Sequence, residues 1–300
     1  MKTVFLYPGL NGLIKSEDRL RFLYLEQVQR RLAQVEKIFS DQFNETVSFL
    51  NYFNLPLEQI YSVQNISKAA SAICAIQVGV SDFLIAMGVQ PTWMVGCSLG
   101  DLARSVSAGM CSFEDCIVSY IKFAKKLEGI EKIGANIGVS KPKAAHFTDE
   151  DLLEMSNMGL DVSVMTQAFL NIGGRYEDLE RFQALAKANR WRVVKILDYP
   201  AHSRYIASYV EGALSQIKNV KTTTPNTRLY SSISCQEISD PLLLKAELIL
   251  NMTKPLKWGE ALKKLENQEG PMQMINMGPC QSISKMFADL NLESKLVEVD

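Results

Sequence analysis

The sequence predicts an α/β fold in which a mainly parallel sheet, covered by helices on both faces, carries a smaller inserted βαββαβ unit. First, short apolar segments typical of strands alternate with longer segments of helical periodicity over most of the 300 residues. Second, the predicted order becomes βαββαβ between residues 131 and 198. We therefore expect a large domain formed by residues 1–130 and 199–300, with a ferredoxin-like subdomain at 131–198.

The segment before the insertion supplies the first strands and helices. Residues 3–7 form an apolar strand that Pro8-Gly9 ends, and residues 93–95 form a second strand. Helices are predicted at about 19–39, 65–87, 101–108 and 113–127. Residues 65–87 carry apolar side chains at helical spacing, so we expect this helix to be buried.

The insertion and the segment after it supply the remaining elements. Within the insertion, strands are predicted at 133–139, 162–167, 169–172 and 193–197, and helices at 149–158 and 176–189. Beyond it, helices are predicted at 205–218, 242–252, 257–266 and 282–290, and strands at 228–233, 272–277 and 295–299. Parallel sheets of this kind bind ligands beyond the carboxyl ends of their strands, so the end of the strand at 93–95 is a candidate site.

Composition and charge exclude several classes of protein. Hydrophobic residues make up 47% of the chain and charged residues 22%, which is typical of a globular protein. The net charge of −1 gives no electrostatic reason to expect binding to nucleic acid or to a membrane surface. We expect no stretch as apolar as the roughly 20 residues of a membrane span, and no secretory signal.

The six cysteines are scattered without the spacing of metal ligands. In a chain of this length they are typical of reduced thiols in the cytoplasm, where we expect the protein to act as a monomer. No cluster of metal ligands and no phosphate-binding loop is present, so the sequence predicts neither a metal nor a bound organic cofactor.

Ser98 lies in Gly96-Cys97-Ser98-Leu99-Gly100, between a predicted strand and a predicted helix. This is the pattern of a nucleophile elbow, in which a sharp turn presents the serine hydroxyl and the following helix directs N–H groups at an oxyanion. A plain tight turn remains open as the alternative. Cys97 is a second nucleophilic side chain, but it precedes the apex, so we expect its thiol to point away from the direction of Ser98.

A serine needs a base to accept its proton, and the chain offers His146 and His202. His146 lies in a polar segment of the insertion, where we expect a solvated loop residue. His202 lies where the insertion returns to the large domain, and such junctions are common places for active sites. The nearby acids Asp198 and Asp240 are more simply turn or cap residues, so a carbonyl group could orient the histidine instead.

Four segments, in order along nearly the whole chain, resemble malonyl-CoA:acyl-carrier-protein transacylases and the acyltransferases of polyketide synthases. These segments are Phe5–Gly12, Gly96–Asp101, Tyr199–His202 and Lys254–Trp258. The resemblance implies an α/β-hydrolase-like large domain and a ping-pong acyl transfer. Ser98 would be the nucleophile and His202 its base. The backbone N–H groups of Leu99 and Leu10 would bind the oxyanion, and the side-chain carbonyl of Asn251 would orient the histidine.

The departures from the family pattern concern the substrate. Malonyl-selective members carry an arginine at the position of Phe123, and its guanidinium binds the malonyl carboxylate. A buried carboxylate without that partner costs on the order of several kcal/mol, so a neutral acyl group is favoured. Cys97, Tyr199 and Ala201 are further candidates for the acyl pocket. We expect Arg104, on the helix that follows the elbow, to be exposed.

Three functions fit the sequence. The first is an acyltransferase that moves an acyl group without a free carboxylate from a coenzyme A or carrier-protein thioester, through acyl-Ser98, to an acyl carrier protein. The second is a hydrolase of acyl-carrier-protein thioesters with the same fold, acting in polyketide biosynthesis. The third is a non-catalytic scaffold for carrier proteins. Because carrier proteins are acidic, two basic clusters are candidate contacts, namely Lys122, Lys125 and Lys126, and Arg190, Arg192 and Lys195.

Overall fold

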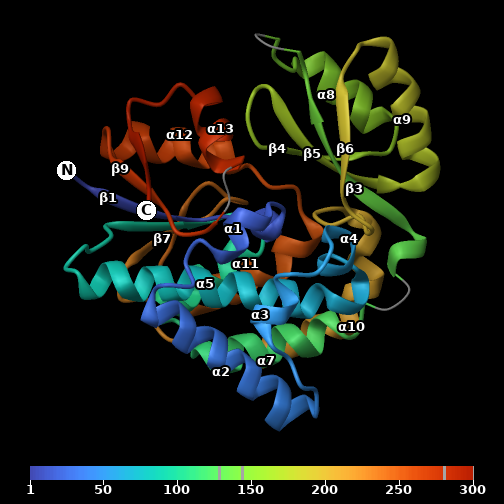
Figure 1. The fold of residues 1–300 in the computed structure, drawn as a ribbon. Helices are drawn as coiled ribbons and strands as arrows, with labels where there is room; N and C mark the ends of the chain where they lie inside the picture. Colours follow the sequence, from blue (N-terminus) through green and yellow to red (C-terminus); the bar gives the residue numbers. More distant parts are fainter. Residues whose placement is uncertain (128–129, 143–144, 280–281, 300) are drawn as a thin grey trace.

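A mainly parallel sheet forms the centre of the larger part of the molecule (Figure 1). The computed structural model describes residues 1–127, 130–142, 145–279 and 282–299. The strand order in this sheet is β10-β9-β1-β2-β7-β8, and every neighbouring pair is parallel except β7 and β8. The strands are β1 Thr3–Tyr7, β2 Trp93–Gly96, β7 Arg228–Tyr230, β8 Glu237–Ile238, β9 Gln273–Asn276 and β10 Lys295–Glu298. This arrangement confirms the predicted α/β class.

Helices cover both faces of the sheet, and the alternation of side chains along β1 shows why. Val4 and Leu6 are buried on one face, against α12 Trp258–Glu269 and α13 Ser282–Asp289. Phe5 belongs to the larger core on the other face. That face is covered by α2 Glu26–Phe43, α5 Ile66–Ala86, α6 Gly100–Ser107, α7 Phe113–Ala124, α10 Ala207–Lys218 and α11 Pro241–Thr253.

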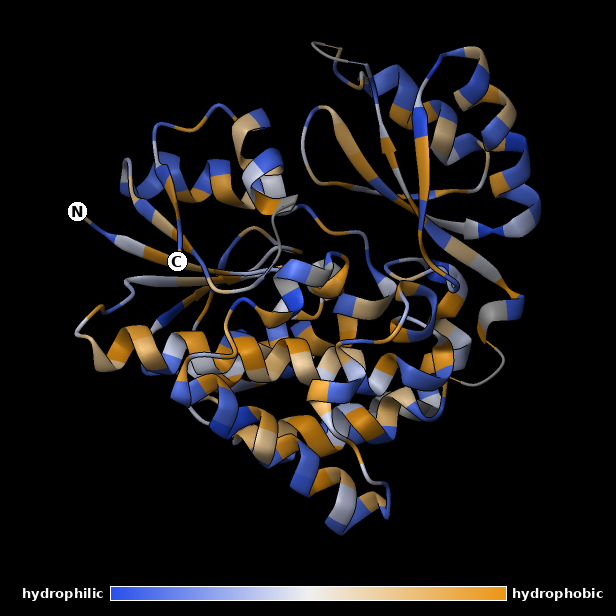
Figure 2. Ribbon diagram, in the orientation of Figure 1, coloured by the Kyte–Doolittle hydropathy of each residue, from blue (hydrophilic) through white to orange (hydrophobic). Residues whose placement is uncertain are grey.

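The long helix α5 runs through this second layer and is apolar along most of its length (Figure 2). By length and composition alone, Val63–Ala86 is long and apolar enough to cross a membrane, contrary to the sequence-based expectation. Within its most apolar window, 72% is buried inside the structure, as in a core helix. The apolar side chains of α5 are thus covered by neighbouring helices and the sheet.

A second sheet lies at the upper right of Figure 1, with the order β4-β5-β3-β6 and antiparallel pairing throughout. Its elements along the chain are β3 Gly134–Ser140, α8 Asp149–Asn157, β4 Asp161–Val164, β5 Phe169–Arg175, α9 Tyr176–Ala188 and β6 Arg192–Leu197. This is the βαββαβ order expected from the sequence. The two helices pack on this sheet around a separate core that includes Leu170 and Phe182.

One predicted helix is divided. Instead of one helix over 19–39, the structure has α1 Ser16–Leu20 and α2, with turns between them. The buried Arg19 explains the division, because its Nε donates to the carbonyl of Leu13 at 2.8 Å and its Nη1 to that of Leu55 at 2.9 Å. These bonds anchor the end of α1 to neighbouring loops. The short helices α3 Phe49–Tyr52 and α4 Leu57–Ile60 and the strand β8 were not predicted.

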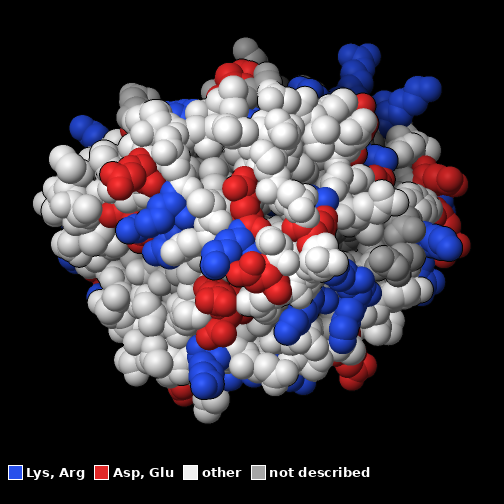
Figure 3. Space-filling view, turned by 60° about the horizontal axis from the view of Figure 1, so that its bottom comes forward, with Lys and Arg blue, Asp and Glu red and all other residues white. Residues whose placement is uncertain are grey.

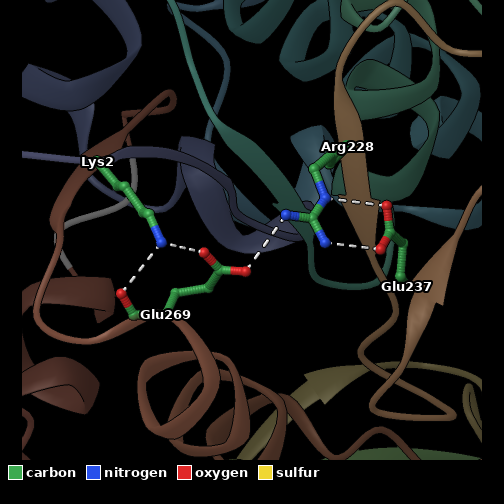
Figure 4. Close-up of polar contacts among 4 residues, drawn as sticks. All are labelled: Lys2, Arg228, Glu237 and Glu269. Carbon is green, nitrogen blue, oxygen red and sulfur yellow. Dashed lines mark hydrogen bonds and ion pairs between the residues drawn. The ribbon is translucent and has the colours of Figure 1, made fainter.

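Charged side chains of both signs are interspersed on the face shown in Figure 3, in keeping with the net charge of −1. At one edge of the sheet they form the network of Figure 4. Arg228 on β7 binds Glu237 on β8 at 2.8 Å and Glu269 at the end of α12 at 3.3 Å, and Lys2 binds the same Glu269. The guanidinium also lies 3.7 Å from the ring centroid of Trp93 on β2. The network therefore joins the edge hairpin, the central sheet and α12.

Candidate active site

Ser98 lies in a sharp turn between β2 and α6, with a φ angle of 56° in the left-handed region that non-glycine residues rarely adopt. The two flanking glycines permit this turn. A Cβ atom on Gly100 would lie 2.0 Å from the carbonyl oxygen of Tyr7, and one on Gly96 would lie 2.2 Å from Oδ1 of Asp101. Helix α6 therefore starts in direct contact with the end of β1, and its N-terminus lies next to the serine.

His202 lies on the loop between β6 and the short 3-10 helix Arg204–Ile206. Its Nε2 is 2.8 Å from Oγ of Ser98, although 104 residues separate the two in sequence. Its Nδ1 is 2.5 Å from the backbone carbonyl oxygen of Asn251 on α11. Because a carbonyl only accepts, Nδ1 carries the hydrogen and Nε2 is left to accept the hydrogen of the serine hydroxyl. The two bonds together fix the tautomer that a general base requires.

The contact of Asn251 with the histidine differs from the sequence-based expectation, which placed the side-chain carbonyl there. The contact is made by the backbone carbonyl. The side-chain Nδ2 instead donates to the carbonyl of Ser98 at 3.1 Å and to Oδ2 of Asp101. The shorter side chain of asparagine thus reaches α6 rather than the imidazole.

The imidazole of His202 is buried, with 4% of its surface exposed. Burial lowers the pKa of His202 to about 4, and the hydrogen bond to Asn251 opposes this shift only in part. The ring is therefore neutral at neutral pH, which is the state that accepts a proton from the serine.

The backbone N–H groups of Leu10 and Leu99 flank Ser98 at the starts of two helices, the 3-10 helix Leu10–Leu13 and α6. Among the described residues, neither amide donates to a backbone carbonyl. The loop that carries Leu10 is held by Tyr61, whose hydroxyl donates to the Leu10 carbonyl at 2.6 Å and accepts from the N–H of Leu13 at 2.9 Å. The loop that carries the Leu10 amide is therefore held in place beside Ser98.

A small cavity of about 40 Å³ opens on one side of the Ser98–His202 pair, and we name it the Phe123 cavity. It includes three residues predicted for the acyl pocket, Phe123, Tyr199 and Ala201. Phe123 is fully buried, with its ring centroid 5.9 Å from that of Tyr120. No lysine or arginine of the described chain lines this cavity.

A second cavity of about 70 Å³ lies on the other side of the pair, and we name it the Asn171 cavity. Cys97 lines it rather than the Phe123 cavity, together with Phe169 and Met286. The side-chain oxygen of Asn171 is buried here and has no hydrogen-bond partner in the described structure. Sequence analysis missed Asn171, although a polar residue within the apolar strand Phe169–Ile172 was a usable signal.

A groove of about 580 Å³ leads outward from both cavities. It shares Leu10 and Leu197 with the Phe123 cavity and Phe169 with the Asn171 cavity. The basic residues Arg192 and Lys195 of β6 line its outer part, where Lys195 is paired with Asp198 at 2.6 Å. We call it the outer groove.

The prediction that Arg104 is exposed is wrong, because its side chain is fully buried. Helix α6 packs between α5 and α11, so its second turn has no solvent-facing side at this position. His146, in contrast, is exposed on the loop before α8. Cys280 lies outside the described residues, and the other five cysteines are buried. Within the described chain, no group of three potential ligands could hold a metal ion.

Comparison with known proteins gives one family. The family model of the acyl transferase domain matches residues 25–286. The malonyl CoA-acyl carrier protein transacylase of Bacillus subtilis is 20% identical over 310 residues, covering 99% of this chain and 93% of the relative.

Solved structures show the same fold. The malonyl-CoA:ACP transacylase of Synechocystis matches with a TM-score of 0.83 at 18% identity, covering 100% of this chain and 97% of the other. A malonyl-transacylase in complex with a type II polyketide synthase acyl-carrier protein also matches with a TM-score of 0.83, at 16% identity, covering 100% and 96% of the two chains.

Proposed function

The chain belongs to the acyl transferase domain family, and from this premise we propose that it transfers a short acyl group without a free carboxylate. The donor is a thioester of coenzyme A or of a carrier protein, the intermediate is an ester of Ser98, and the acceptor is an acyl carrier protein. The observation that carries the proposal is the pair of contacts at His202, 2.8 Å to the Ser98 hydroxyl and 2.5 Å to the Asn251 carbonyl. These contacts also argue against a non-catalytic scaffold.

In the first half-reaction, Nε2 of His202 accepts the hydroxyl proton as Oγ of Ser98 attacks the thioester carbonyl. The N–H groups of Leu10 and Leu99 stabilise the oxyanion. The C–S bond then breaks, and His202 returns its proton to the departing thiolate. In the second half-reaction the thiol of the acceptor arm gives its proton to His202 and attacks acyl-Ser98. The new thioester forms, and Oγ of Ser98 recovers the proton.

The Phe123 cavity supports a short neutral acyl group. Its volume of about 40 Å³ corresponds to roughly three or four water-sized spheres, which is room for only a few carbon atoms. A malonyl carboxylate placed beside Phe123 would lose its hydration without gaining a cationic partner.

The Asn171 cavity and the outer groove support a thioester arm on the opposite side of Ser98. The unpartnered side-chain oxygen of Asn171 can accept a hydrogen bond from an amide N–H of a phosphopantetheine arm. The outer groove, of about 580 Å³, would carry the arm to the surface, where the carrier protein would lie against β6.

The proposal extends to the organisation of the chain. We propose that residues 131–198 act as a ferredoxin-like subdomain that forms one wall of the site, and that the protein is a cytoplasmic monomer. Acyl transfer between thioesters requires neither a metal nor a bound organic cofactor, so the chain's own residues carry the chemistry.

The test is intact-protein mass spectrometry after mixing with acetyl-, malonyl- and longer acyl-coenzyme A, and with the matching acyl carrier proteins. We expect a stable acetyl-sized adduct that passes to fresh carrier protein. Free acid, with the carrier protein left bare, would instead identify the hydrolase of the same fold. No adduct from any thioester would overturn both activities.

The same assay tests the nucleophile. Ser98→Ala should abolish the adduct, because it removes the hydroxyl that lies 2.8 Å from His202 Nε2. Cys97→Ala should keep the adduct, since Cys97 lies in the other cavity. An adduct retained in Ser98→Ala and lost in Cys97→Ala would assign the nucleophile to the thiol.

A further inference from the structure

Three charged side chains lie buried beneath the elbow, and the mechanism above uses none of them. Arg104, Asp101 and Glu247 are exposed by 0%, 1% and 6%, and we name them the buried ion cluster. Nη2 of Arg104 lies 2.8 Å from Oδ1 of Asp101 and 3.9 Å from Oε1 of Glu247. Nη1 donates to the carbonyl of Tyr230 at 2.6 Å.

The buried ion cluster connects to the catalytic pair through Asn251. Oδ2 of Asp101 accepts a hydrogen bond from the Asn251 side chain, and the backbone carbonyl of the same asparagine accepts the Nδ1–H of His202. Glu247 precedes Asn251 by one turn of α11. Helix α6, which begins just after Ser98, is therefore joined to α11 at two successive turns.

The charges of the cluster do not balance, because two carboxyl groups share one guanidinium. Burial raises the pKa of both Asp101 and Glu247, and the charge of Arg104 opposes the shift in each case. Such a cluster is weak evidence for stability, since packed apolar side chains commonly serve an interface as well or better. Two of its contacts are directional hydrogen bonds, from Nη1 of Arg104 to the Tyr230 carbonyl and from the Asn251 side chain to Oδ2 of Asp101.

We propose that Asp101 and Arg104 are positioning residues, which hold Asn251 so that its backbone carbonyl faces Nδ1 of His202 while Ser98 faces Nε2. The inference rests on the proposed function for its chemistry. Glu247 completes the cluster with a carboxyl group 3.9 Å from Nη2 of the guanidinium. Without the Asp101–Asn251 bond, the carbonyl of Ser98 is the remaining acceptor for the Asn251 side chain, and the backbone carbonyl that sets the tautomer of His202 is held less firmly.

The test uses a fluorophosphonate, which reacts with an activated serine whatever acyl group the protein prefers. Asp101→Leu should lower the maximal labelling rate by about 10²-fold, the effect of a displacement of roughly 1 Å at a catalytic group. Asp101→Asn should lie between Asp101→Leu and the wild type, because its side-chain oxygen can still accept from Asn251. The concentration for half-maximal labelling should stay unchanged in both.

A matched control separates positioning from stability. Val35→Ala removes buried volume from α2, away from the elbow, and should lower the unfolding midpoint while leaving the labelling rate of the folded protein unchanged. If Asp101→Leu does not fold, Asp101→Asn and Arg104→Lys take its place, and both should fold and label more slowly. Wild-type rates in the folded variants would show that the cluster is only structural.

The outcome is separable from that of the proposed function. If the fluorophosphonate labels wild-type Ser98 but no acyl thioester does, the acyltransferase assignment fails and the positioning comparison still holds. If thioesters acylate all variants at the wild-type rate, the acyltransferase stands and the positioning role fails.

Discussion

The buried imidazole of His202 determines how activity depends on pH. Because burial lowers its pKa to about 4, the neutral base persists well below pH 6.5, and activity is lost only as the pH falls through the lowered pKa. We expect the rate of Ser98 acylation to stay level from pH 8 to about 5 and to halve near pH 4. The free energy of unfolding also decreases as the pH falls from 6.5 to about 4, because in this range the unfolded chain binds a proton at His202 that the folded chain does not.

The measurement is single-turnover acylation against pH, with circular dichroism to establish that the protein remains folded. His146→Gln should give the same profile, since His146 is exposed. Glu247→Gln shows whether a loss of activity at acid pH comes from His202 or from Glu247, because burial raises the pKa of Glu247 to about 7. An acid limb near pH 6.5 that persists in Glu247→Gln would contradict the buried neutral base.

We propose that Phe123 determines which acyl group the Phe123 cavity accepts. Phe123→Arg places a guanidinium beside the Phe123 cavity and supplies the partner that a malonyl carboxylate lacks. We expect the ratio of malonyl to acetyl loading to rise by at least about tenfold, which corresponds to roughly 1.4 kcal/mol. Competitive loading read by mass spectrometry gives the ratio, and Phe123→Leu controls for loss of the ring. An unchanged ratio in Phe123→Arg would mean that this side chain does not contact the acyl group.

At the residue scale, the sequence predicted Ser98 and His202, which the structure brings together, but not the residues that hold them in place. Ser98 and His202 stood out because a turn pattern and a scarce residue type mark them. The acceptor for Nδ1 is a backbone atom of Asn251, and backbone atoms leave no trace in side-chain identity. Arg104 was misplaced because its partners Tyr230 and Glu247 lie 126 and 143 positions away in the sequence, and nothing near Arg104 and its local partner Asp101 indicates that the ion pair is buried.

At the scale of elements, the elbow depends on glycine where α6 touches β1. In Gly100→Ala the new Cβ would lie 2.0 Å from the carbonyl oxygen of Tyr7, a backbone atom that cannot move without shifting the sheet. We expect a loss of about 3 kcal/mol in the free energy of unfolding, the upper end for overpacking, together with loss of Ser98 labelling.

For Gly212→Ala on α10 we expect the opposite effect on stability, because the new Cβ would meet no atom within 4 Å. Alanine there should stabilise the helix by about 0.5–1 kcal/mol. Thermal unfolding of both variants measures the contrast. Equal midpoints would show that the start of α6 tolerates a side chain and that the close contact is not required.

Elements with clear helical periodicity or an unbroken apolar run were predicted within a few residues, as α5 and the strands β1, β9 and β10 show. The failures are short or held by distant contacts. Helices α3 and α4 have four residues each, too few for a periodic signal. The break between α1 and α2 depends on Arg19, whose partners at Phe53 and Leu55 are more than 30 positions away in sequence.

At the scale of the whole molecule, the outer groove bears on which of the two basic clusters we propose as the carrier-protein contact. Arg192 and Lys195 line the groove that leads to Ser98, whereas Lys122 and Lys126 lie exposed on and just after α7 and line none of the three cavities described above. Lys125 of the first cluster is paired with Glu45 at 3.5 Å and lies over the ring of Phe43. The structure therefore favours the cluster on β6.

Arg192→Glu should raise KM for an acidic carrier protein while leaving kcat/KM for a small soluble thioester unchanged, because only the carrier protein contacts the groove's outer part. The rise should shrink as salt is added, since exposed charges are screened within about 10 Å at 0.1 M. Lys122→Glu is the matched control with the same change of charge and should leave both substrates unaffected. Steady-state kinetics at two salt concentrations measure the difference. Equal losses in Arg192→Glu and Lys122→Glu would mean that net charge, and not the groove, governs the encounter.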